Sequence, residues 1–222
     1  ASRRTTLAAL LRRPEWALAL LSAVEKHELQ RTDLAAEHWQ QLKAHPDNQV
    51  AAKAGELEKT AGVALNLDME AVVKKLLPIA QEKGDLARGK EVFTTTCAVC
   101  HTFNGQGAKI GPDLSGIGAR ARADILVDIA DPNRSVEANY RMWNVTTKVG
   151  DTYSGRLDGE TQTSVEIFDT AGQKHSIQRK DIESLDASNL SVMPGGFDAL
   201  PATDLAALLE FLTQTPHDGA KN

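Results

Sequence analysis

The chain has 222 residues, of which 41% are hydrophobic and 25% are charged, values that are ordinary for a globular protein. Its net charge is −5, its pI is near 5.7, and no basic stripe runs along it, which argues against a nucleic-acid-binding protein. The longest apolar run, from Trp16 to Val24, is too short to span a bilayer, and no secretion signal opens the chain.

Residues 1–82 are expected to form an all-helical segment. Apolar residues recur at helical spacing from Ala17 to Val24, and a second helix is predicted after Thr32-Asp33. The sequence His45-Pro46-Asp47-Asn48 separates that helix from a third, and the apolar stripe from Met69 to Ala80 predicts a fourth. Short breaks between the helices indicate either stacked helical pairs, as in a solenoid, or a plain helical bundle.

The composition changes at Gly84, where a short helix is predicted to lead into the cysteines, followed by a glycine-rich loop. A further helix is predicted over residues 122–130, and the last one follows Thr203. Between about 140 and 186 apolar residues alternate with polar ones. We predict four short strands there, separated by turns at Gly150-Asp151, Asp158-Gly159 and Ala171-Gly172. Their even spacing indicates a small antiparallel barrel or a curled sheet.

The only two cysteines lie in Cys97-Ala98-Val99-Cys100-His101, which is the attachment sequence for a c-type haem. Cysteines at positions i and i+3 of one helical turn face the same way, so their sulfurs can reach the two vinyl groups of one haem. The next residue, His101, then places its imidazole over the iron.

Three alternatives to haem attachment remain for this motif. A thioredoxin-like redox pair needs a βαβ context, which the pattern of elements does not offer. A zinc site needs four ligands, and the chain has no second cysteine pair. The third alternative is a chance occurrence of five residues.

The flanks of the motif resemble those of class I cytochromes c. The matching features are Gly89-Lys90-x-x-Phe93, Gly111-Pro112-Asp113-Leu114 and a late Met-Pro, so the resemblance covers residues 84–131 and 187–213. It implies that the Pro112 carbonyl accepts a hydrogen bond from His101, which would orient the ring and make it a better donor to iron. By its position after Gly116, Arg120 resembles the arginine that faces a haem propionate.

The resemblance also implies a second axial ligand far along the chain. Met193 stands in an irregular segment just before the last helix, where the family places its methionine ligand. A neutral, soft thioether paired with histidine raises the reduction potential of the iron. Met69 lies on an apolar helical stripe and Met142 begins a strand, so both are expected in cores, while His175 is the alternative ligand.

Taken with the β segment and the helical segment before the motif, the chain is similar to the C-terminal haem-binding domain of large planctomycete and verrucomicrobial proteins. In those proteins the domain follows HEAT-like helical repeats, often downstream of a sugar-dehydrogenase-like propeller. Since the chain begins at Ala1, we expect it to be a fragment.

We therefore expect a mainly α protein, with a class I cytochrome c fold, an inserted small antiparallel β-barrel and an N-terminal all-helical segment. The expected division is a helical segment at 1–82, the first part of the cytochrome c domain at 83–139, the barrel at 140–186, the second part at 187–215, and a disordered tail at 216–222.

The function expected from the resemblance is one-electron transfer by a monohaem c-type cytochrome, without catalysis. Its cofactor would be one covalent haem c with its iron, held by Cys97, Cys100, His101 and Met193. Its partners would be a redox donor and a redox acceptor, with a dehydrogenase domain as a fused or separate donor. A periplasmic or otherwise extracytoplasmic location follows from covalent haem attachment. The alternatives are a haem-based sensor or gas-binding module, in which a ligand displaces Met193, and a peroxidase.

Overall fold

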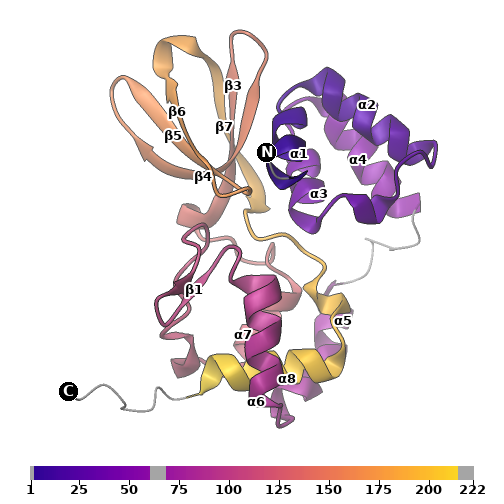
Figure 1. Cartoon of the computed structure of the whole chain (residues 1–222), viewed down its shortest axis with the longest axis vertical. Coiled ribbons are helices and arrows are strands. Elements are labelled where there is room, and N and C mark those ends of the chain that lie inside the picture. Colours follow the sequence, from indigo (N-terminus) through magenta and orange to yellow (C-terminus); the bar gives the residue numbers. More distant parts are fainter. Residues whose placement is uncertain (1–2, 61–68, 215–222) are drawn as a thin grey trace. The chain divides into compact units, whose positions relative to one another are not determined.

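The computed structural model describes residues 3–60 and 69–214, and the predicted disordered tail lies outside them. The chain forms two compact units, each built from two stretches of sequence. We call residues 1–67 with 135–194 the helix–sheet unit, and residues 68–134 with 195–222 the motif unit (Figure 1). Within the described ranges, none of the helices combines the length and the apolar character needed to cross a membrane.

The helical part of the helix–sheet unit begins one helix earlier than the sequence pattern indicates. Its helices are α1 (Arg3–Leu10), α2 (Pro14–Glu25), α3 (Ala36–Lys43) and α4 (Asn48–Thr60), with a short 3-10 turn, η1 (Arg31–Asp33), before α3. The three helices predicted here, which correspond to α2, α3 and α4, are confirmed. The Asp47 side chain caps α4 by accepting from the backbone N–H groups of Gln49 and Val50 at 2.9 and 3.1 Å. Leu21, Leu42 and Val50 are fully buried between these helices.

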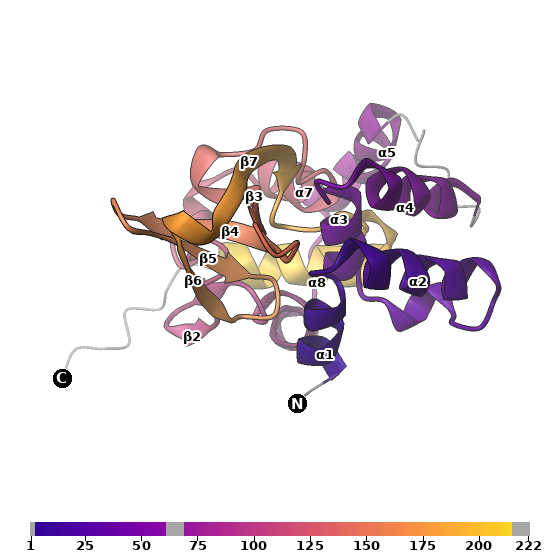
Figure 2. The same ribbon diagram turned by 90° about the horizontal axis from the view of Figure 1, so that it is seen from above.

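The strands of this unit form one antiparallel sheet with the order β6-β5-β4-β3-β7 (Figure 2). Their bounds are β3 (Arg141–Thr147), β4 (Thr152–Glu160), β5 (Ser164–Asp169), β6 (Lys174–Gln178) and β7 (Ile182–Ser191). Val145, Val165 and Ile167 are fully buried on one face. The 3-10 turn η6 (Arg179–Asp181) joins β6 at one edge to β7 at the other.

The expected fold class, a mainly α protein with a small inserted barrel, is wrong. The structure is 48% helical and 21% strand, and the five-stranded sheet is not closed into a barrel. The four predicted strands exist, but the ten-residue strand β7 escaped prediction because its burial does not alternate regularly. The predicted turn at Asp158-Gly159 is instead a β-bulge between Leu157 and Gly159, and β4 runs on to Glu160.

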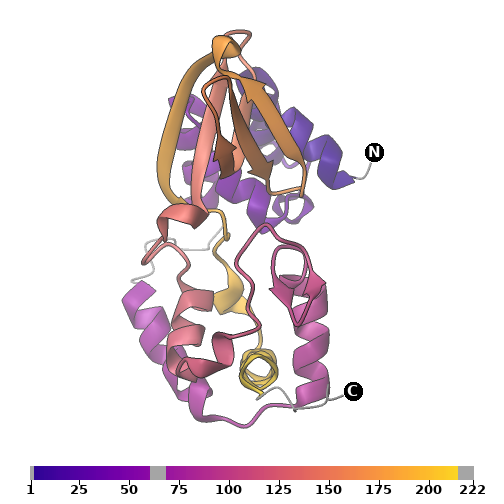
Figure 3. The same cartoon turned by 90° about the vertical axis from the view of Figure 1, so that its left-hand side faces the viewer.

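The motif unit is mostly helical. Its elements are α5 (Met69–Leu76), the 3-10 turn η2 (Leu77–Gln81), α6 (Leu86–Val92), the π-helical turn η3 (Phe93–Cys97), the two-residue strands β1 (Thr102–Phe103) and β2 (Gln106–Gly107), η4 (Ile117–Ala119), α7 (Arg122–Ala130), η7 (Phe197–Ala199) and α8 (Ala202–Thr213). Figure 3 views α8 end-on within this unit. The helices predicted at 122–130 and after Thr203 are confirmed, and the stripe from Met69 divides at Pro78 into α5 and η2.

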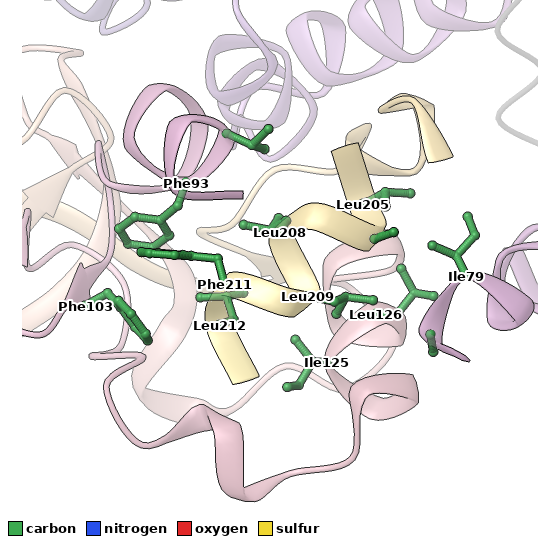
Figure 4. Close-up of a cluster of buried hydrophobic side chains, with 13 residues drawn as sticks. Ile79, Phe93, Phe103, Ile125, Leu126, Leu205, Leu208, Leu209, Phe211 and Leu212 are labelled. Carbon is green, nitrogen blue, oxygen red and sulfur yellow. The ribbon is translucent and has the colours of Figure 1, made fainter. Parts of the chain in front are cut away.

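The core of the motif unit is centred on α8 (Figure 4). Leu205, Leu208 and Leu209 of this helix are fully buried, and Phe211 packs against Phe93 with ring centroids 5.5 Å apart. Helices α6 and α8 approach so closely that a Cβ atom built on Gly89 would lie 2.0 Å from the carbonyl oxygen of Ala207. Only glycine fits there, so this contact fixes the start of the segment that leads to the cysteines.

Candidate functional site

The helix that leads into the cysteine motif ends in a π-helical turn. Asp85 caps α6 by accepting from the backbone N–H of Arg88 at 2.7 Å, and the turn Phe93–Cys97 follows without a break. The backbone N–H of Ala98 donates to the carbonyl oxygen of Phe93 at 2.8 Å, five residues back. Such turns hold one more residue than an α-helical turn and are frequent at functional sites. The sequence pattern does not reveal this one.

Both cysteines and His101 lie on a single turn. The backbone N–H groups of Cys100 and His101 donate to the carbonyl oxygen of Cys97 at 3.0 and 2.9 Å. The two cysteines are not joined in a disulfide, both are partly buried, and Cys97 packs against the core of the motif unit. Burial, with a smaller contribution from Cys100, raises the pKa of the Cys97 thiol to about 12, so this thiol stays protonated at neutral pH.

The His101 ring is fixed by the glycine-rich loop. It is 9% exposed, and its Nδ1–H donates to the carbonyl oxygen of Pro112 at 2.9 Å. Since a carbonyl can only accept, the neutral ring carries its proton on Nδ1, and Nε2 keeps the lone pair that a metal ion needs. Burial lowers the pKa of His101 against the opposing effect of the Pro112 hydrogen bond, which favours this neutral form.

Two glycines allow the loop to pass close to this ring. A Cβ atom on Gly111 would lie 2.6 Å from Cε1 of His101, and one on Gly107 would lie 2.1 Å from the His101 carbonyl oxygen. The backbone N–H of Gly111 donates to the carbonyl oxygen of Cys100 at 2.7 Å, which ties the loop back to the turn. From the sequence, Pro112 was named and Gly111 was quoted beside it, but the close approach of Gly107 and Gly111 to His101 was not predicted.

The arrangement suits a haem and disfavours the other two chemical interpretations of the motif. It offers two thiols three residues apart and an adjacent neutral imidazole held by a carbonyl, which is the donor set of a covalent haem with one protein ligand. Over residues 3–60 and 69–214, no group of three or more His, Cys, Asp or Glu side chains is placed to hold a metal ion, which argues against zinc. The motif follows a helix within a helical unit, so the βαβ context of a thioredoxin-like pair is not present around it.

The remaining predicted residues are not part of this turn. Arg120 is in the motif unit, where its exposed guanidinium pairs with Asp128 at 2.6 Å. Met193 is half-buried and belongs to the helix–sheet unit, just before the second stretch of the motif unit begins at Gly195. His175, the alternative ligand, is engaged elsewhere: its Nε2 lies 2.7 Å from Oδ2 of Asp169, and its ring packs against Tyr153.

Comparison with known proteins finds a partial match to cytochrome c. Residues 86–152 match the family model for cytochrome c, and most of this stretch lies in the motif unit. A cytochrome c of Cochliobolus lunatus is 44% identical over 45 residues, which are 20% of this chain and 42% of that protein. Cytochrome c of Arabidopsis thaliana is 43% identical over 44 residues, 19% of this chain and 39% of the relative. The chain thus spans about two fifths of the length of these relatives.

The cytochrome c match implies covalently bound haem c with its iron as the cofactor. The match ends at residue 152, the first residue of β4, so it does not account for the rest of the sheet or for the helices before residue 86.

Proposed function

We propose that the protein is a monohaem c-type cytochrome that transfers single electrons. The observation that carries this proposal is the turn that brings together Cys97, Cys100 and His101, with the His101 ring held by Pro112. The two thiols would be the haem attachment points, and Nε2 of His101 would bind the iron. Haem iron held in this way gains and loses one electron at a time.

Attachment requires each cysteine thiol to add across one vinyl group. A sulfur–carbon bond forms, the carbon–carbon double bond becomes single, and the thiol proton moves to the other vinyl carbon, so no electron is gained or lost.

Met193 is proposed as the sixth ligand and Arg120 as a partner of a haem propionate. Met193 precedes Pro194 in an irregular segment before α8, and its thioether would raise the reduction potential. Arg120 pairs with Asp128 at an exposed position, and such pairs contribute little to stability. Exchanging Asp128 for a propionate would therefore cost little.

The cellular setting proposed here is extracytoplasmic, most simply periplasmic, because covalent haem attachment takes place outside the cytoplasm. We propose a dehydrogenase-like donor, fused or separate, and a second redox protein as acceptor. The resemblance to planctomycete and verrucomicrobial haem-binding domains that follow HEAT-like repeats supports this setting. In that proposal, residues 83–139 and 187–215 are the two parts of the cytochrome c domain.

Denaturing electrophoresis with haem staining tests the attachment. Wild-type protein is expected to keep its colour on the polypeptide. Cys97→Ala and Cys100→Ala are each expected to keep a single thioether, which intact-mass measurement and a shifted pyridine haemochrome band would report. Colour that leaves the wild-type polypeptide on denaturation would contradict the proposal.

Absorption spectroscopy distinguishes electron transfer from sensing. A six-coordinate His/Met iron gives a thioether-to-iron charge-transfer band near the red end of the spectrum, and Met193→Ala is expected to abolish it. Met69→Ala, which changes a half-buried methionine of α5 outside the cluster that packs around Val192, is the control and should keep the band. Reduced wild-type protein that binds carbon monoxide readily would favour the sensor alternative instead.

A further inference from the structure

Hydrogen bonds within the helix–sheet unit restrain the backbone that leads to Met193 at three consecutive residues. Strand β7 ends at Ser191, which pairs with Arg141 of β3. The next backbone N–H, of Val192, donates to the carbonyl oxygen of Tyr140 at 2.9 Å. The N–H of Met193 then donates to the Ser191 hydroxyl at 3.0 Å, so each of these three consecutive residues has a defined partner.

Helix α3 holds the same segment from another side. Gln40 is 1% exposed, and its Nε2 donates to the carbonyl oxygen of Ser191 at 3.1 Å across 151 residues of sequence. Ala44, one turn further along, packs with Val192 and Met142 in a small buried cluster. The carbonyl oxygen of Ala44 accepts from Nδ2 of Asn144 on β3 at 2.6 Å, which fixes the end of the helix to the sheet.

After Met193, the backbone is restrained by the proline that follows it in the sequence. Pro194 fixes its own φ and disfavours the helical region for the residue before it, so fewer backbone conformations are open to Met193. Met193 is therefore a half-buried side chain on a backbone that is fixed before it by buried hydrogen bonds and after it by a proline. This is more support than a surface methionine in a connecting segment requires.

We propose that Gln40, acting through Ser191, is the positioning residue for Met193 as an iron ligand. The inference rests on the proposed function, in which Met193 is the sixth ligand. A ligand needs its orientation fixed by surrounding hydrogen bonds, and loss of such support typically weakens the metal bond. The role of α3 is then to restrict the Met193 backbone, so that little conformational entropy is lost when the thioether binds.

Competition with imidazole measures how firmly Met193 is held. Imidazole binds oxidised haem iron by displacing the thioether, so its apparent affinity rises as the methionine is loosened. Gln40→Leu keeps a similar volume and removes the donor to Ser191. From the usual contribution of one hydrogen bond, we expect imidazole to bind the oxidised holoprotein about fivefold more tightly. The charge-transfer band should also weaken.

Gln41→Leu is the matched control, because Gln41 is the next residue on the same helix and is 4% exposed. Loss of a buried amide lowers the unfolding midpoint in both variants, but only Gln40→Leu should change imidazole affinity. Ser191→Ala provides a second variant should Gln40→Leu fail to fold, since it removes the hydroxyl that accepts from the Met193 N–H. It is expected to raise imidazole affinity in the same direction.

The two proposals fail in different ways. Wild-type imidazole affinity in Ser191→Ala, and in Gln40→Leu when it folds, would overturn the positioning role if Met193→Ala abolishes the charge-transfer band. A Met193→Ala protein that keeps the band would overturn the ligand assignment itself, and with it the positioning role.

Discussion

The Nδ1–H of His101 donates to the carbonyl oxygen of Pro112 at 2.9 Å, and Gly111 lies against the flat side of the same ring. The hydrogen bond sets the tautomer, while the glycine leaves room for the ring. Orientation of the proposed iron ligand therefore depends on two adjacent backbone positions, and a change at the first of them can be tested without removing a donor or an acceptor.

Gly111→Ala is expected to displace the ring. The added Cβ would lie 2.6 Å from Cε1 and 2.8 Å from Nδ1, so the ring must move and its bond to Pro112 must lengthen. Overpacking of this kind typically costs about 1–3 kcal/mol. We expect the free energy of unfolding to fall by that amount in urea titration, and the haem bound per chain to decrease.

The control for this change is Gly116→Ala in the same loop. No heavy atom lies within 4 Å of a Cβ built there, and the backbone φ of −100° suits alanine. This variant should match the wild type in haem content and in reduction potential. Equal haem content and stability in both variants would contradict the role assigned to Gly111.

Gly89→Ala tests the contact between α6 and α8. The new Cβ would lie 2.0 Å from the Ala207 carbonyl oxygen and 2.8 Å from Cβ of Phe211, so the helices must separate. We expect the free energy of unfolding to fall by about 1–3 kcal/mol. Gly55→Ala in α4, where a Cβ meets nothing within 4 Å, should instead stabilise the protein by about 0.5–1 kcal/mol, because alanine is the better helix former. Chemical denaturation followed by circular dichroism measures both.

Sequence reasoning succeeded where the relevant contacts are local. The haem attachment motif spans five residues, and the helix ends depend on neighbours such as Pro14 and Asp47. Pro112 was predicted through a family resemblance, and its bond to His101 spans only eleven residues. These features depend on short stretches of chain, so they can be predicted from a single sequence.

Contacts between distant segments were not predictable in the same way. Alternation of apolar residues predicts strands, but it does not say whether the two edges of a sheet meet, so the expected barrel was wrong. The approach of Gly89 to α8 and the bond from Gln40 to Ser191 join positions far apart in the chain. Neither contact can be predicted from residue type, because a glycine or a glutamine in a helix does not indicate which distant residue it will contact.

Acid sensitivity of the motif unit is expected to depend on the pair of Arg122 and Glu210. Nη1 of Arg122 lies 2.8 Å from Oε2 of Glu210, and this hydrogen bond lowers the pKa of the carboxyl group from its ordinary value of 4.5. A carboxyl group with a lowered folded-state pKa stabilises the fold at pH values above 4.5, and this stabilisation is lost as the pH falls below that value.

Glu210→Gln should therefore lower the urea midpoint at pH 7 and have a smaller effect in acid, once the pH falls below the lowered pKa and the wild-type carboxyl group is neutral too. Urea titrations between pH 3 and pH 7 measure the difference. Glu91→Gln, which changes an exposed partner of Arg88 on α6, is the control and should alter the midpoint little at any pH. A midpoint difference for Glu210→Gln that is independent of pH would contradict this assignment.

Arg120 provides the last test, because its proposed partner is a haem propionate while its partner in the structure is Asp128. The pair is exposed on both sides, so Arg120→Gln should change the free energy of unfolding by no more than about 0.5 kcal/mol. If the guanidinium faces a propionate, removing its positive charge favours the oxidised iron, and the reduction potential should fall. Arg88→Gln, which removes the same charge from an exposed pair with Asp204, is the matched control and should leave the potential nearly unchanged. Redox titration of the holoproteins measures both, and equal potentials in Arg120→Gln and Arg88→Gln would contradict the propionate assignment.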